Sequence, residues 1–269
     1  MTWSIKTGLP AAYLATLVLA MAFAPVLAVH SPEDQNRDCP CAAPSQRYLL
    51  GTDELGRDVW SRLLYGGRIS LGAGLIAATL SVGIGLLAGA AAGLSRGILR
   101  RSMLALAELF LSVPWLYLLL AIRAFLPLTL TPAQVLLLLS AVIGAAGWAR
   151  PGRLMAQKAG EVREREYVEA AESFGATRWH VMKRHLMPAL LPLAGTQFLL
   201  LLPGYVLAEV TLTFFGLGVA EPAASWGSLL APLRHPAAAS CLQIASPLPL
   251  LASLVVACEL LGKQGRGDT

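Results

Sequence analysis

One short motif in this sequence matches the pattern of a hydrolytic nucleophile. Residues 93–97, Gly-Leu-Ser-Arg-Gly, fit G-x-S-x-G, in which a serine on a sharp strand-to-helix turn attacks a carbonyl carbon. That chemistry needs a strand before the serine, together with an acid and a histidine that activate its hydroxyl group. Here apolar stretches flank Ser95, and the four histidines lie in other loops. We therefore expect no catalytic residue in this chain.

The four cysteines could serve redox chemistry or metal binding. Cys39, Cys41, Cys241 and Cys258 are too few and too scattered for a disulfide-stabilised scaffold. Cys39 and Cys41 are separated by a single residue and have no histidine cluster beside them. This spacing does not match known zinc sites, so we expect no metal site. In an oxidising compartment either of them could form a disulfide with Cys241, and free thiols are the alternative.

Two glutamates, Glu108 and Glu209, lie within long apolar stretches. An ionisable side chain that faces lipid costs on the order of several kcal/mol, so such groups normally face protein or a water-filled path. We expect Glu209 to face protein or a translocation path, and both glutamates are candidates for functional polar residues within a membrane.

The elements that carry these residues must lie in lipid. Hydrophobic residues make up 56% of the 269 residues and charged residues only 14%, whereas about 25% is usual in soluble domains. So little polar surface cannot cover so much apolar side chain. The formal charge of +5 does not indicate nucleic-acid binding, because the basic residues stand in short clusters between apolar runs. We predict an all-α integral membrane protein.

Six stretches are long and apolar enough, or nearly so, to cross about 30 Å of hydrocarbon as helices. They cover about 9–29, 69–94, 103–125, 133–148, 189–213 and 242–261. The first is longer than the core of a signal peptide, so we interpret it as an uncleaved span. The second is rich in glycine and alanine, which allow helices to pack closely in lipid.

The basic residues predict the orientation of these spans. Most of the 21 lysines and arginines lie on the side of the N-terminus, and short loops rich in Lys and Arg stay in the cytoplasm. We therefore expect both termini to be cytoplasmic. The chain would divide into 1–68, a first span and an extracytoplasmic loop with an amphipathic segment; 69–262, the transmembrane core with an inner segment at 150–188; and 263–269, a short cytoplasmic tail.

The inner segment predicts two helices joined by a glycine. The first, over 163–174, is charged but carries an apolar stripe at helical spacing. The stripe consists of Tyr167, Ala170, Ala171 and Phe174. Gly175 should end this helix in a left-handed conformation, and Thr177 can cap a second helix over 178–186 that Pro188 separates from the fifth span. The product is an elbow, which is either a surface for a cytoplasmic partner or a solvated linker.

The elbow also carries a sequence motif. Glu169-Ala170-Ala171, three residues, Gly175, nine residues, and then His185-Leu186-Met187-Pro188 resembles the Glu-Ala-Ala loop of ABC importer permeases. His185 and Met187 stand where the general family pattern has apolar residues. The pair Arg184-His185 and the stretch 163–168 (Arg-Glu-Arg-Glu-Tyr-Val) are similar to the dipeptide, oligopeptide and nickel branch of that family.

Two further blocks resemble the same branch in the same order. Residues 51–59 (GTDELGRDV), followed by Ser61-Arg62 and Tyr65-Gly66, are similar to its signature before the second span. Residues 214–219 (FFGLGV) with 225–227 (SWG) are similar to its segment after the fifth span. The resemblance covers about 49–229, whereas the tail after the last span is shorter than is usual in the family.

The resemblance implies a permease subunit in the bacterial inner membrane. Its partners would be a second homologous permease, two ATP-binding subunits and an extracytoplasmic substrate-binding protein. ATP and Mg would be held by the partners, since this chain has no G-x-x-x-x-G-K-[ST] phosphate loop and is expected to bind no cofactor of its own. The resemblance implies that substrate specificity lies largely in the binding protein. The sequence of this chain therefore does not identify whether the transported solute is a peptide, a nickel ion or another small solute.

The resemblance also implies roles for single residues. Coupling to an ATPase would fall to Tyr167, Glu169, Ala170, Ala171, Phe174, Gly175 and Pro188. Glu108 matches an acidic position near the inner mouth, and Glu209 matches a glutamate of the fifth span. The alternatives are a secondary transporter or channel, against which the elbow argues, and a membrane-embedded hydrolase, for which no paired catalytic groups are found at membrane depth.

Overall fold

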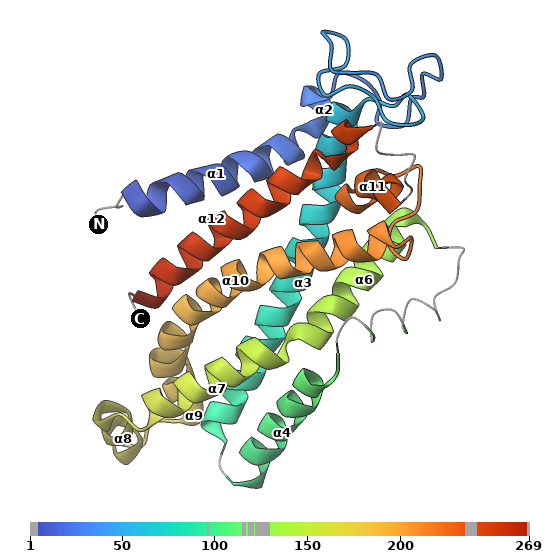
Figure 1. The fold of residues 1–269 in the computed structure, drawn as a ribbon. Coiled ribbons are helices and arrows are strands. Elements are labelled where there is room, and N and C mark those ends of the chain that lie inside the picture. Colours follow the sequence, from blue (N-terminus) through green and yellow to red (C-terminus); the bar gives the residue numbers. More distant parts are fainter. Residues whose placement is uncertain are drawn as a thin grey trace.

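The protein is all-helical in the residues that its computed structural model describes: 5–95, 97–114, 117, 121, 130–234 and 241–267. Within them the only extended pairing is an isolated bridge between Thr52 and Asp58. Figure 1 shows long helices running side by side, with an irregular loop region at one end of the bundle and the short helix α8 (Glu166–Ser173) at the other.

Four helical segments are long and apolar enough to cross a membrane. They are α3 (Val59–Leu94), the continuous pair α6 (Pro132–Gly147) and α7 (Ala149–Arg163), the run from α9 (Arg178–Val181) through the π-helical turn η1 (Met182–Leu186) to α10 (Met187–Phe214), and Gln243–Gly265, most of which is α12 (Pro247–Gly267). Such segments satisfy their own backbone hydrogen bonds in lipid, so the chain is a multi-pass membrane protein.

Two of the six predicted spans are not among these four. The first divides into α1 (Ile5–Ala22) and α2 (Ala24–Leu27), because Pro25 in the first turn of α2 breaks the helix at Phe23. For the third, the structure describes α4 (Ile98–Ser112), while most of 113–125 lies outside the described residues. The six-span arrangement therefore remains a prediction.

The second predicted span begins earlier than the sequence suggests. α3 starts at Val59 instead of residue 69, with the Asp58 carboxylate accepting a hydrogen bond from the Ser61 amide as its N-cap. Arg62, whose charge suggested a loop, is only 1% exposed and is ion-paired inside the protein. The boundary expected between 68 and 69 thus falls within a continuous helix.

Two expectations about the helices next to the elbow are also wrong. Trp148, where the fourth span was expected to end, has helical dihedral angles (φ −62°, ψ −24°), so α6 continues into α7. Pro188 does not separate the second elbow helix from the fifth span, because it lies in the first turn of α10, directly after η1. Proline lacks an amide hydrogen and its ring crowds the carbonyl four residues earlier, and the wider π-helical turn accommodates both effects without ending the helix.

α3 lies at the centre of the bundle and packs against α6, α7 and α10. Gly85 and Gly89 face α7, where a β-carbon on Gly85 would lie 2.9 Å from the Gly152 amide nitrogen and one on Gly89 2.9 Å from the Gly152 carbonyl oxygen. The missing side chains therefore allow the two backbones to approach, as the small-residue pattern predicts. The remaining short helices are α11 (Trp226–Leu230), η2 (Ala231–Arg234) and η4 (Leu242–Ala245).

Candidate functional sites at the two ends of the bundle

The elbow consists of α8, a glycine turn and α9. The sequence predicts one helix over 163–174, but α7 ends at Arg163 and α8 starts at Glu166, with Arg165 in an extended conformation between them (φ −79°, ψ 137°). α8 is therefore free to point away from the axis of α7, and Figure 1 shows it beside the end of that helix.

The turn after α8 has the hydrogen bonds of a glycine-capped helix end. Gly175 has φ +86°, and the amides of Gly175 and Ala176 donate to the carbonyls of Glu172 and Ala171. The Thr177 side chain then caps α9 by accepting from the His180 amide. The predicted glycine turn and threonine cap are both present.

One face of the elbow is anchored in the bundle. Val168 of α8 and Val181 of α9 are fully buried, and they pack in one cluster with Val162, Leu186 and Leu190. Arg163 adds a polar anchor, because its guanidinium donates to the Leu94 carbonyl (3.0 Å) at the end of α3 and pairs with Glu172 of α8 (3.6 Å). The elbow is thus fixed to both α3 and α10.

The opposite face of the elbow carries large apolar side chains in the open. Tyr167 is 54% exposed, Phe174 93% and Trp179 73%, and Ala170 lies exposed between the first two. Ala171, the fourth residue of the predicted stripe, is only half-buried, so the stripe turns partly toward the bundle. Trp179 was missed in the sequence, because four residues of α9 are too few to show a helical period.

The other predicted elbow residues lie around this face. Glu169 is exposed, and its carbonyl oxygen accepts a hydrogen bond from the Ser173 hydroxyl group (2.9 Å). The rings of Tyr167 and His185 are 5.5 Å apart, which connects α8 to η1. Pro188 is exposed at the start of α10.

At the loop end of the bundle, the block at 51–62 forms a network of ion pairs. The Arg57 guanidinium binds the Asp53 carboxylate (Nε to Oδ2, 2.7 Å) and both oxygens of Glu221 (2.9 and 3.1 Å), although Glu221 is 164 residues away in the chain. Arg62 reaches the same two acids (3.6 and 3.3 Å). Burial alone would raise the pKa of Glu221, but the hydrogen bonds and charges of the two arginines outweigh it and lower that pKa.

A disulfide closes the same region, which we call the outer cap (residues 30–62, 221 and 241) after the side of the membrane that the sequence predicts for it. Cys41 is bonded to Cys241, with Cα atoms 5.0 Å apart, while Cys39 is free. Gly56 has φ +74°, and a β-carbon there would collide with the carbonyl of Asn36. The sequence left open whether Cys39 or Cys41 pairs with Cys241 or whether all of them are free thiols, and the structure has the Cys41–Cys241 bond.

The two candidate glutamates have different surroundings. Glu209 in α10 is 2% exposed and faces α3 and α11, where it accepts a hydrogen bond from the Thr213 hydroxyl group (2.8 Å) near Ser70 and Ser225. It therefore faces protein, not lipid. Glu108 in α4 is 61% exposed and lies 3.6 Å from Arg153 of α7. Ser95, the serine of the hydrolase-like motif, ends α3 and donates its hydroxyl group to the Ala91 carbonyl.

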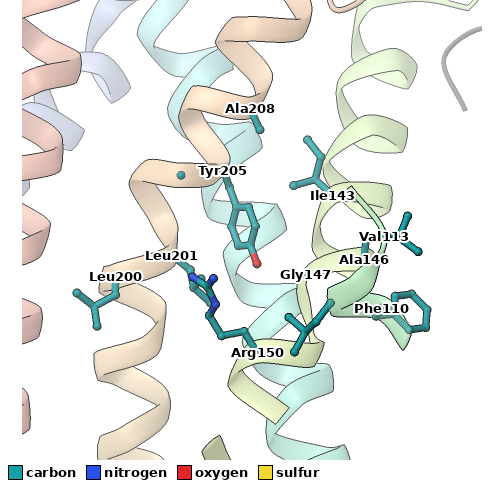
Figure 2. Close-up of a pocket in the computed structure, with 12 residues that line it drawn as sticks. Phe110, Val113, Ile143, Ala146, Gly147, Arg150, Leu200, Leu201, Tyr205 and Ala208 are labelled. Carbon is teal, nitrogen blue, oxygen red and sulfur yellow. The ribbon is translucent and has the colours of Figure 1, made fainter. Parts of the chain in front are cut away.

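A cavity of about 340 Å³ opens between α4, α6, α7 and α10 (Figure 2). Its walls are mostly apolar, and the polar side chains among its described lining residues are Arg150 and Tyr205. Figure 2 shows both pointing into it, Arg150 from α7 and Tyr205 from α10. The sequence did not single out either residue, because only the packing of the helices brings them together.

The comparisons with known proteins fit these sites. Residues 81–257 match the family described as "Binding-protein-dependent transport system inner membrane component". The chain is 33% identical over 239 residues to the "Probable D,D-dipeptide transport system permease protein DdpC" of Escherichia coli (strain K12), covering 87% of this chain and 78% of that protein. It is 31% identical over 223 residues to the "Dipeptide transport system permease protein DppC" of Bacillus subtilis (strain 168), covering 82% and 68%.

A third relative is the "Oligopeptide transport system permease protein OppC" of Haemophilus influenzae (strain ATCC 51907 / DSM 11121 / KW20 / Rd), which is 33% identical over 220 residues, covering 81% of this chain and 68% of that protein. The family match takes in well over half of the chain, including α6, α7, the elbow and α10. The chain therefore belongs to the family of binding-protein-dependent transport system inner membrane components, and it is a permease subunit of such a system.

Proposed function

We propose that this chain is one of two permease subunits of an ATP-driven importer of peptides or similar small solutes. Family membership supports the transport role, and the three relatives above are permeases of dipeptide, D,D-dipeptide and oligopeptide systems. Two ATP-binding subunits, a second permease and an extracytoplasmic substrate-binding protein would be separate chains, and ATP would be hydrolysed in those partners.

The exposed apolar face of the elbow is the observation that carries this proposal. A solvated linker would expose polar side chains, whereas Phe174 and Trp179 expose most of their surface next to the small residue Ala170. Aromatic side chains of this kind are typical anchors of protein interfaces, and a small residue between them allows a partner to come close. We infer that an ATP-binding subunit docks on this face.

The anchored face of the elbow supports a route for transmitting motion. A push on α8 would reach α3 through Arg163 and its bond to the Leu94 carbonyl, and it would reach α10 through α9 and η1. Because Val168 and Val181 are fully buried, the elbow would move with these helices as one body. Closure of the ATP-binding subunits would then tilt the spans between inward-open and outward-open states.

The disulfide supports an orientation. Disulfides persist in oxidising compartments, and Cys41 is bonded to Cys241. The loop between α2 and α3, to which Cys41 belongs, lies at the end of the bundle opposite α8 (Figure 1). The outer cap would therefore face the extracytoplasmic side and the elbow the cytoplasm. This agrees with the basic residues of the elbow and with cytoplasmic termini.

Two elbow variants test the coupling. Gly175→Val forces a branched residue into φ +86°, which costs about 1 kcal/mol or more and redirects α9, and Ala170→Glu places a charge on the docking face. We expect both variants to insert in the membrane but to lose peptide-stimulated ATP hydrolysis and uptake in reconstituted complexes.

The control is Gln157→Glu, which adds the same charge at an exposed position of α7 outside the elbow. It should support normal coupled uptake. If Gly175→Val and Ala170→Glu also transport and hydrolyse ATP like the wild type, the elbow is a solvated linker and the coupling proposal is wrong.

A further inference from the structure

Arg150 is the charged residue in the cavity between α4, α6, α7 and α10. It lies near the middle of the continuous helical segment Pro132–Arg163, where the described wall of the cavity is otherwise made of apolar side chains, glycines and Tyr205. The described lining holds no carboxylate that could neutralise it. The cavity therefore presents one exposed positive charge beside apolar walls.

Arg150 differs from the other arginines packed around the bundle. Arg57, Arg62, Arg153 and Arg163 each pair with a carboxylate. In the part of the chain that the structure describes, Arg150 has no ion pair and no hydrogen bond, and it lines the cavity together with Tyr205. Arg150 is exposed at the cavity, and an ionisable residue within a membrane-spanning segment normally faces the path of a substrate or ion.

Tyr205 offers a complementary group beside it. Its hydroxyl group donates to the Ser81 hydroxyl oxygen (2.7 Å), so its own oxygen remains free to accept a hydrogen bond. Gly147 stands opposite, where any β-carbon would collide with that hydroxyl group. The cavity thus holds a cation and a fixed hydrogen-bond acceptor together.

We propose that this cavity binds the carboxylate end of the transported solute. Arg150 would hold the carboxylate, which matches the planar guanidinium, and Tyr205 would accept an N–H group beside it. The apolar walls would contact the rest of the molecule, and a volume of about 340 Å³ lies within the range of small-molecule sites. A peptide with a free C-terminus has all three features. The inference rests on the proposed function and names the part of the solute that this chain recognises.

The test compares two forms of one short peptide, the free acid and the C-terminal carboxamide. Uptake into vesicles by the complete importer is measured for the wild type, Arg150→Gln and Arg150→Lys, and each variant is divided by the wild type for each peptide. Any preference of the binding protein cancels in this ratio. We expect Arg150→Gln to lower uptake of the acid about tenfold and that of the carboxamide less than about twofold, with Arg150→Lys in between.

Filling the cavity gives an independent test. Gly204 lines it, and a β-carbon there would meet no atom within 4 Å, so Gly204→Leu should occupy the cavity without disturbing the fold. Gly195 is also unobstructed but lies nine residues earlier, on the opposite face of α10, which makes Gly195→Leu the matched control. We expect the first variant to assemble with its partners but to lose uptake of both peptides, and the second to transport both peptides normally.

Three results would overturn the inference. Equal losses of acid and carboxamide uptake in Arg150→Gln would make Arg150 a residue for structure or gating. A loss that appears only in vesicles with phosphatidylglycerol, and not in pure phosphatidylcholine, would identify a lipid phosphate as the anion. Normal uptake by Gly204→Leu would exclude the cavity as a binding site. If the wild-type complex takes up peptide, any of these three results overturns only the inference about the cavity and leaves the proposed function intact. If the wild-type complex shows no ATP-dependent uptake, both the inference and the proposed function are wrong.

Discussion

The outer cap and the elbow lie at opposite ends of the same helices and differ in how their side chains are accommodated. The outer cap buries charged side chains, whereas the elbow exposes apolar ones. In the outer cap, Arg57 and Arg62 are 6% and 1% exposed, and both find carboxylates within the chain. In the elbow, Phe174 and Trp179 are 93% and 73% exposed and have no such cover. One region is complete in the single chain, and the other leaves its largest apolar groups in contact with solvent.

The two regions therefore differ in whether their side chains find partners within the chain. Buried charges are tolerated only when paired, so removal of one partner in the outer cap would leave an uncompensated charge inside the protein. Exposed aromatic side chains add little to the stability of a single chain, which is why we propose a docking partner for those of the elbow. Both regions carry family-like sequence blocks, but only the structure distinguishes their roles.

The largest effect should follow from removing an acid of the outer cap. Asp53→Ala leaves two buried arginines with Glu221 alone and removes the acceptor of the Arg57 and Leu55 amides. Breaking a buried pair on one side costs about 3–5 kcal/mol, which thermal unfolding of the purified permease can measure. Glu54→Ala, at the exposed neighbouring position, is the control and should unfold like the wild type. A stable Asp53→Ala protein would show that the outer cap does not depend on its ion pairs.

An elbow variant should show the reverse pattern. Trp179→Ala removes a side chain that is 73% exposed, so the thermal unfolding of the permease should not change. Loss of an interface anchor costs about 2 kcal/mol, so the dissociation constant for the ATP-binding subunit should rise about thirtyfold. Ile98→Ala, which truncates an apolar residue of α4 that is 79% exposed, should bind normally. Unchanged binding by Trp179→Ala would remove this residue from the docking face.

The smallest effect concerns the pH dependence of the outer cap. The pKa of Glu221 is lower in the folded protein than in the unfolded chain, so its ion pairs stabilise the fold above the ordinary carboxyl pKa of about 4.3. This contribution is lost as the pH falls through the folded pKa. Glu221 is half-exposed, so the difference in unfolding temperature between wild type and Glu221→Gln should be small, about 2 °C or less at pH 7. It should shrink toward zero in acid; a difference that grows on acidification would contradict the assignment.

The glycine turn and the helix cap of the elbow could be predicted from the sequence, whereas the residues at which its helices begin and end could not. Gly175 and Thr177 act on their own neighbours, so their left-handed turn and helix cap follow from residue type. The break at Arg165 and the continuity at Pro188 depend on how Val168 and Val181 pack into the bundle, and no local pattern reveals that. The sequence around Trp148 likewise did not reveal that α6 continues into α7 through this residue.

The sequence by itself determined that the chain is a helical membrane protein, because apolar content and span length depend only on composition and order. It also determined the family, through three short blocks in order. Only the tertiary structure decided that Arg57 meets Glu221 across 164 residues, that Cys41 and not Cys39 bonds Cys241, and that Arg150 and Tyr205 face one cavity. The physical reason is that pairing and burial are properties of surfaces brought together by packing, and residues far apart in the chain carry no local signal of them.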